Sequence, residues 1–228
     1  MHPLFYRLLD AKRTLGFKKM IWVTPRWLMR REYLVLVRDL LLPLPEIPTH
    51  ESMEWTSLTE AEVPRVLAIN PVMSEAEIQR RWREGQECLL CWIGGSLAHY
   101  RWDTCRAAYL PYLGKTLCLQ QGDIHAPDIF THPAFRGRGI HLVSSLMALR
   151  RARDLGFSRS ITIVAWWNAP ALQVNRQKTN RTIAGTVGYW NIGPWRYYST
   201  TGDVWLDQCQ SMWIRPKDGG NQESQHDT

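Results

Sequence analysis

The sequence lacks the features of a membrane-spanning or secreted protein. Its 228 residues contain no apolar run close to the roughly 20 residues that a transmembrane helix needs. The best stretch, from Tyr33 to Leu44, is interrupted by Arg38 and Asp39. Charges recur every few residues at the N-terminus, where a secretory signal has an apolar core. The five scattered cysteines are typical of reduced thiols, so we expect a cytoplasmic protein.

Several ligand-binding motifs are also missing. Cys88 and Cys91 form a lone C-x-x-C with no second pair, so we expect no metal site. A dinucleotide fingerprint would need glycine where Leu142 stands, and a P-loop would need glycine where Tyr109 stands. The sequence has no zinc-finger, RNA-recognition or basic-zipper pattern, so we expect no nucleic-acid partner.

Positive charge is concentrated in one segment. The net charge is +7, and residues 1–40 contain nine basic and three acidic residues among many aromatic and aliphatic ones. Such a segment can pack as a helix on its own domain or on a partner subunit, which leaves a homodimer open. It can also lie on an anionic membrane surface, here the inner face. The sequence favours neither interpretation decisively.

The chain divides into three parts by composition. Residues 1–50 are interpreted as a basic N-terminal arm and a proline-rich linker, residues 51–214 as one domain, and residues 215–228 as a disordered polar tail. Within the domain, apolar periodicity predicts strands first, then strand–helix–strand–helix, then two closing strands. This order predicts an α+β fold, with a single sheet that carries helices on both faces.

One segment, from Asp128 to Leu142, carries recognisable chemistry. A strand ends, Pro133 follows, and a basic glycine-rich loop then leads into a long helix. The first N–H groups of a helix have no internal acceptor, and the helix dipole favours an anion there. Gly137 and Gly139 allow the backbone to approach a phosphate closely. We therefore expect a pyrophosphate at this loop.

The segment Arg136-Gly-Arg-Gly139-Ile-His141 resembles the signature of the GNAT superfamily of acyl-coenzyme-A-dependent N-acyltransferases, Arg/Gln-x-x-Gly-x-Gly/Ala. His141 departs from it in the last position. Asn168 fits a second element of the family, Asn-x-x-Ser, with Ala171 in the serine position. The resemblance covers about residues 53–206. It implies a mixed, mostly antiparallel sheet of about seven strands, preceded here by the basic arm.

The resemblance also implies how acetyl-coenzyme A, or another acyl-coenzyme A, would bind as co-substrate. The sheet would open in a V between the strand that ends near Thr131 and the strand at residues 161–166. The pantetheine arm would pair with the backbone of Ile129, Phe130 and Thr131, and a backbone N–H near Phe130 would polarise the thioester. The expected cofactor-binding residues are Ile129, Phe130, Thr131, Arg136, Gly137, Arg138, Gly139, Ile140, His141 and Asn168.

Three residues are candidates for proton transfer. Asp128 is the first candidate for a general base or an ammonium anchor, and His125 lies on the same predicted strand. The usual acid of the family would stand where this chain has Asn175, which is a poor proton donor, so Tyr189 is a substitute candidate. Two of the three have a structural alternative: a solvated carboxylate for Asp128 and a packed aromatic ring for Tyr189.

His141 has two interpretations from sequence. Its side chain could pair with a phosphate, or it could face solvent on a polar stripe with Ser144, Ser145 and Arg151. The resemblance predicts direct transfer of an acetyl or other acyl group to an amine. The basic N-terminal arm would repel a basic peptide tail, so the arm and the twelve Trp residues favour a small or lipid-linked acceptor such as an amino sugar. The alternatives are a non-catalytic GNAT-like binding module and an adaptor that binds a membrane surface or polyanion.

Overall fold

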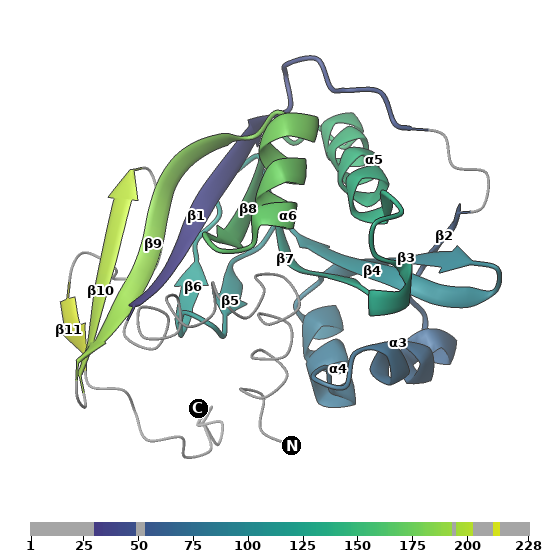
Figure 1. The fold of residues 1–228 in the computed structure, drawn as a ribbon, viewed down its shortest axis with the longest axis horizontal. Helices are drawn as coiled ribbons and strands as arrows, with labels where there is room; N and C mark the ends of the chain where they lie inside the picture. Colours follow the sequence, from purple (N-terminus) through teal and green to yellow (C-terminus); the bar gives the residue numbers. More distant parts are fainter. Residues whose placement is uncertain (1–29, 49–52, 193–194, 203–211, 215–228) are drawn as a thin grey trace, which may run out of the picture.

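A mixed sheet forms the centre of the molecule (Figure 1). The computed structural model describes residues 30–48, 53–192, 195–202 and 212–214. The strands of the large sheet are β1 (Arg30–Asp39), β2 (Met53–Ser57), β3 (Glu87–Ile93), β4 (Ser96–Thr104), β7 (Asp123–Thr131), β8 (Arg159–Ala165), β9 (Thr182–Ile192), β10 (Trp195–Gly202) and β11 (Met212–Ile214). Their order is β11-β10-β9-β1-β8-β7-β4-β3-β2. Of the described pairs, β7 with β8 alone is parallel, which confirms the predicted mixed, mostly antiparallel sheet.

Strand β1 corrects the predicted division of the chain. Residues 30–39 were assigned to the arm, yet they pair with β8 on one side and β9 on the other. The alternation of Tyr33, Val35 and Val37 explains this position, because these apolar residues contribute to one core cluster. The sheet domain therefore includes residues before 51. The predictions for residues 1–29 and for the tail 215–228 lie outside the described residues.

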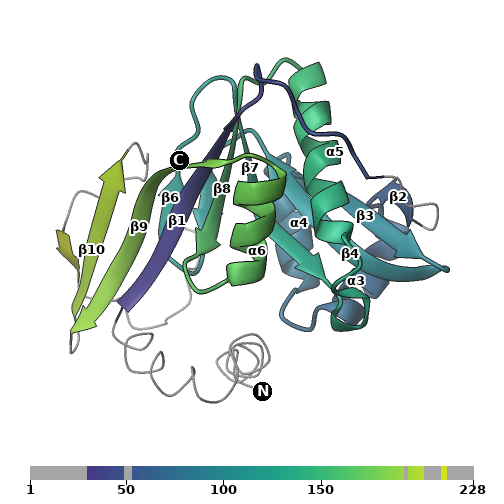
Figure 2. The same ribbon diagram turned by 45° about the horizontal axis from the view of Figure 1, so that its top comes forward.

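Helices cover both faces of the sheet, as predicted (Figures 1 and 2). They are η1 (Glu60–Glu62), α3 (Val63–Ile69), α4 (Glu75–Arg83), η2 (Pro133–Phe135), α5 (Ile140–Asp154), α6 (Ala169–Gln173) and the π-helical turn η3 (Val174–Lys178). Val66 of α3 and Ile78 of α4 pack on Tyr100 and Trp102 of β4. Helices α5 and α6 lie on the opposite face. In the described part of the chain, no helix has the length and apolar character needed to cross a bilayer.

A small hairpin extends the core beneath the other half of the sheet. In the described part of the chain, strands β5 (Ala108–Leu110) and β6 (Lys115–Leu117) form a separate two-stranded sheet. Leu110, Leu113 and Leu117 of this hairpin are buried against residues of β1, β8 and β9. The hairpin therefore closes one face of the sheet next to β8.

Candidate active site

The sheet opens between its two parallel strands. Strands β7 and β8 pair at three positions, from Asp123 opposite Arg159 to His125 opposite Ile161. Beyond His125 no further β7–β8 pair forms, whereas β7 remains paired with β4 as far as Thr131. The two strands therefore separate along residues 126–131, where the V-shaped opening was expected.

Local chemistry explains why the strands separate there. Pro127 follows the last pair by two residues, and proline has no N–H to donate to a neighbouring strand. The register between β4 and β7 shifts at the same place, so that Asp103 faces both Ala126 and Pro127. Such a bulge bends the strand that carries the extra residue. A missing donor and a bend thus act together at the base of the opening.

The free edge of β7 presents backbone groups to the opening. The N–H of His132 donates to Ala98 O of β4 at 2.9 Å, so the carbonyl of Thr131 in the same planar peptide unit points away from β4. Arg136 Nε donates to this carbonyl at 3.2 Å. Because direction alternates along a strand, Ile129 and Thr131 turn their N–H groups to the opening, while Phe130 turns its own to β4.

The glycine-rich loop forms the N-terminus of α5, at the end of β7. Gly137 and Gly139 have φ values of 81° and 76°, a region that residues with a Cβ avoid. Gly139 is the N-cap, and its carbonyl accepts from the N–H groups of Leu142 and Val143. The N–H groups of Ile140 and His141 thus have no acceptor within the helix. Arg138 is exposed and lies over the Phe135 ring at 5.2 Å, so this arginine belongs to the loop that precedes the α5 N-terminus.

The side chain of His141 is half-buried rather than solvent-facing. Its Nε2 atom is buried, and no hydrogen-bond partner is found among the described residues. Burial, followed by the charges of Arg101 and Arg181, lowers the pKa of His141 to about 4. Without a bound anion the imidazole is therefore neutral at pH 7, and pairing of His141 with a phosphate stays a prediction.

The predicted solvent-facing polar stripe of α5 is wrong for its two serines, whereas Arg151 is exposed as predicted. Ser144 and Ser145 are buried, because β4 presents polar groups to them. Ser144 Oγ lies 2.9 Å from His99 Nε2, and Ser145 Oγ accepts from Arg101 Nη1 at 3.5 Å. The polar side of the helix therefore faces the sheet at these positions.

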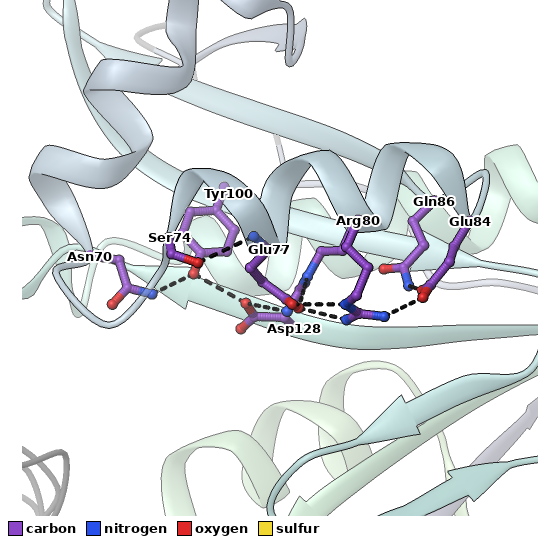
Figure 3. Close-up of polar contacts among 9 residues, drawn as sticks. Asn70, Ser74, Glu77, Arg80, Glu84, Gln86, Tyr100 and Asp128 are labelled. Carbon is purple, nitrogen blue, oxygen red and sulfur yellow. Dashed lines mark hydrogen bonds and ion pairs between the residues drawn. The ribbon is translucent and has the colours of Figure 1, made fainter. Parts of the chain in front are cut away.

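Asp128 lies on the opposite face of the sheet, beneath α4 (Figure 3). Tyr100 donates its hydroxyl proton to Asp128 Oδ2 at 3.2 Å, and Arg81 Nη2 lies 3.3 Å from the same oxygen. Burial raises the pKa of Asp128, while Arg81 and the Tyr100 hydroxyl act against this rise. The side chain keeps 28% of its surface exposed. A carboxylate with a raised pKa and partial access to solvent has the properties of a general base.

The structure does not gather the three predicted proton-transfer residues. His125 is buried at the base of the opening, and its Nδ1 lies 3.1 Å from Ile161 O. Burial lowers its pKa to about 4. Tyr189 belongs to β9, which β8 and β1 separate from β7. Its ring packs on Tyr198 with centroids 5.7 Å apart, so its contacts are those of a packed aromatic.

The short helix after β8 carries the two asparagines that the sequence singled out. Asn168 is the N-cap of α6, and its Oδ1 accepts from the N–H of Ala171 at 3.3 Å. Asn175 is buried in η3, and its Nδ2 donates to Ala171 O at 2.8 Å. The position where the resemblance places an acid thus holds a structural amide. A groove of about 750 Å³ runs along another side of this helix, with Arg176 and Arg181 among its lining residues.

Sequence reasoning missed the partners of Asp128. Arg81 and Tyr100 come from elements 28 or more residues away, so no local motif links them to Asp128. A weak signal exists in β4, where Tyr100 and Trp102 alternate with His99 and Arg101. Such a strand has aromatic residues on one side and basic residues on the other, and a buried Tyr hydroxyl needs a polar partner.

Comparison with known proteins supports the fold. No protein-family model and no curated protein matches the sequence. A solved protein of the GNAT family from Novosphingobium aromaticivorans matches with a TM-score of 0.50 and 17% identity, covering 70% of this chain. A Drosophila protein matches with a TM-score of 0.51 and 12% identity, covering 76% of this chain. The matches span 62% and 56% of the length of those two proteins.

These likenesses agree with the geometry described above. Three features occur together, as the resemblance of residues 136–141 implied. They are the parallel strand pair that separates after three residues, the glycine-rich start of the helix that follows it, and the order of the elements. The chain therefore has the GNAT fold.

Proposed function

We propose that the protein is an acyltransferase that moves an acetyl or other acyl group from coenzyme A to an amine. The observation that carries this proposal is the opening between β7 and β8, with the α5 N-terminus at its end. Pantetheine amides can pair with the free edge of β7 at Ile129 and Thr131. The pyrophosphate can bind the N–H groups of residues 137–141 and the two loop arginines.

Asp128 and the β7 backbone supply the chemistry for direct attack. The amine nitrogen forms a bond to the thioester carbon while Asp128 accepts the amine proton. The negative charge on the carbonyl oxygen is held by an N–H turned to the opening, from Ile129 or Thr131. The C–S bond then breaks. Because Asn175 replaces the expected acid, the thiolate leaves with a proton from water.

The acceptor is a small-molecule amine, and an amino sugar is one class that suits it. The basic surplus of residues 1–40 supports a separate proposal, that this segment contacts an anionic membrane surface at the cytoplasmic face. A homodimer is a further proposal for the same segment. Each needs its own measurement, because the proposed acyl transfer depends on neither.

Calorimetric titration with acetyl-coenzyme A tests the cofactor site. We expect micromolar binding that Arg136→Ala/Arg138→Ala weakens at least tenfold, about 1.4 kcal/mol. The matched control is Arg153→Ala, which removes an exposed arginine at the other end of α5. Binding without turnover of any amine would indicate a non-catalytic module. No heat, and no competition by free coenzyme A, would contradict the proposal.

A further inference from the structure

The contacts of Asp128 are unevenly shared between its two oxygens. Tyr100 and Arg81 both contact Oδ2, at 3.2 and 3.3 Å. Within the described residues, Oδ1 has no hydrogen bond or ion pair. One oxygen is thus held in place by two donors, and the other keeps its lone pairs for a proton from outside the protein.

Arg81 is itself held rigidly. Its Nε donates to Glu77 Oε1 at 2.8 Å, its guanidinium lies over the Trp102 ring at 5.2 Å, and its side chain is 10% exposed. Glu77 lies four residues earlier on α4, the spacing at which side chains meet on a helix. The contacts of Arg81 with Glu77 and with Asp128 therefore connect α4 to β7.

The helix that carries Arg81 has a fixed start. Ser74 is the N-cap of α4, and its Oγ accepts from the N–H of Glu77 at 3.2 Å. Tyr100 is fixed as well, because Asn70 Nδ2 donates to its hydroxyl oxygen at 2.6 Å. The hydroxyl proton of Tyr100 is thus directed to Asp128. Glu77 thus orients Arg81, and Asn70 orients Tyr100.

We propose that Arg81 is a positioning residue for the acyl transfer, which fixes Oδ2 of Asp128 and presents Oδ1 to the acceptor amine. This inference rests on the proposed function. Tyr100 supplies the second contact, and Glu77 orients Arg81. Arg81 touches neither substrate nor thioester and acts through Asp128 alone.

The titratable groups around Asp128 predict how the loss of Arg81 would change the pKa of Asp128. The titratable groups that face Asp128 come from four elements: Arg81 and Glu77 from α4, Tyr100 from β4, Cys88 from β3, and Tyr112 from the turn between β5 and β6. Arg81 is the cation of this set. A cation 3–4 Å away typically lowers a carboxyl pKa by about 1–3 units. Without it, burial keeps Asp128 protonated to higher pH.

The experiment compares Arg81→Met and Arg81→Lys with the unaltered protein, using acetyl-coenzyme A and an amine acceptor. Methionine keeps apolar packing over Trp102. Lysine keeps the positive charge but lacks the planar guanidinium with its several N–H donors. We expect the midpoint of the acidic limb of the kcat/KM pH profile to move to higher pH by about one unit or more in Arg81→Met. Arg81→Lys shifts it less. The control is Arg83→Met, an exposed arginine on the same helix, which leaves the limb in place.

A second measurement does not depend on turnover. The ¹³C resonance of the Asp128 carboxyl, assigned with Asp128→Asn, gives its pKa directly in each variant. An unchanged pKa and an unchanged limb in a folded Arg81→Met protein would overturn the inference. If the unaltered protein transfers no acyl group while Arg81→Met still raises the Asp128 pKa, the proposed function fails but the positioning of Asp128 by Arg81 stands.

Discussion

Asp128 shows how one side chain can combine charge with burial. Its carboxylate contacts an arginine and a tyrosine hydroxyl, which offset part of the cost of removing a charge from water. Its neighbour Phe130 stacks on Tyr100 with centroids 5.6 Å apart and so limits water on that side. We therefore expect a substitution at Asp128 to lower the rate of acyl transfer and to leave the affinity for acetyl-coenzyme A unchanged.

Asp128→Asn keeps the size of the side chain and removes the base. We expect kcat/KM to fall by about 10²–10⁴-fold, the usual contribution of a positioned general base. Acetyl-coenzyme A affinity stays within about twofold in calorimetry, since the anion site is built from residues 136–141. Asp154→Asn, at an exposed carboxylate of α5, serves as the control. Equal activity of Asp128→Asn and the unaltered protein would exclude the proposed base.

His125 makes the fold sensitive to acid. Its pKa is about 4 in the folded protein against an ordinary value of 6.5, so the unfolded chain binds the proton more readily. Stability is then lost as the pH falls below 6.5, by about 2 kcal/mol between pH 7.5 and 5.0. We expect His125→Gln, which keeps a donor for Ile161 O, to lose about 2 kcal/mol less over that interval. Denaturant unfolding at both pH values measures this, and equal losses in the two proteins would contradict it.

The residues of the site were unequally predictable. Gly137, Gly139 and Asp128 could be found because they lie within one strand–loop–helix segment whose pattern is local. Arg81 and Tyr100 could not, because their relation to Asp128 exists only after α4 packs on the sheet. His141 was ambiguous for a similar reason, since the neighbours that bury it, Arg101 and Arg181, lie on other elements.

At the level of elements, α5 was located correctly but its faces were not. The sequence predicted a long helix after the glycine-rich loop, and the structure has it at Ile140–Asp154. Hydrophobic periodicity assigns polar residues to solvent. Here the sheet below is itself polar at His99 and Arg101, so the serines of α5 are buried against it. A pattern on one element cannot reveal the chemistry of its partner.

The contact between β1 and β9 depends on a glycine. A Cβ at Gly188 would lie 2.1 Å from Arg31 O of β1, far inside van der Waals contact. We expect Gly188→Ala to force the strands apart and to cost at least the ~1–3 kcal/mol typical of overpacking. Ile183→Ala, at a side chain of β9 that is 45% exposed, changes stability by less than ~0.5 kcal/mol. Denaturant midpoints of the two variants test the prediction, and similar midpoints would refute it.

At the scale of the whole molecule, β1 joins the two halves of the sheet. Among the described strands, β9, β10 and β11 connect to β8 through β1, and Figure 2 shows β1 between β9 and β8. The sequence predicted the fold class and most strands, but it missed this one. The basic residues around 30–39 suggested an arm, and the partners of β1 on β8 and β9 lie 120 to 160 residues away, beyond the reach of any local pattern.

Truncation tests the role of β1. Removal of residues 1–39 deletes this strand, and we expect loss of the cooperative unfolding transition and of dispersed amide resonances. Removal of residues 1–29 deletes no described strand, and we expect it to leave the sheet folded. The shorter truncation is also the proper test of a membrane or polyanion contact, because it removes basic residues without removing β1. A folded, cooperative protein without residues 1–39 would contradict this role.

The position of β1 also constrains how the chain is made. The strand leaves the ribosome before β8 and β9 exist, and at about 5–20 residues per second it waits on the order of ten seconds for its partners. During that time its apolar residues and both of its hydrogen-bonding edges are unpaired. Contacts this distant in sequence also make folding slow. The nascent protein is therefore a strong candidate for a chaperone client until its C-terminal strands are complete.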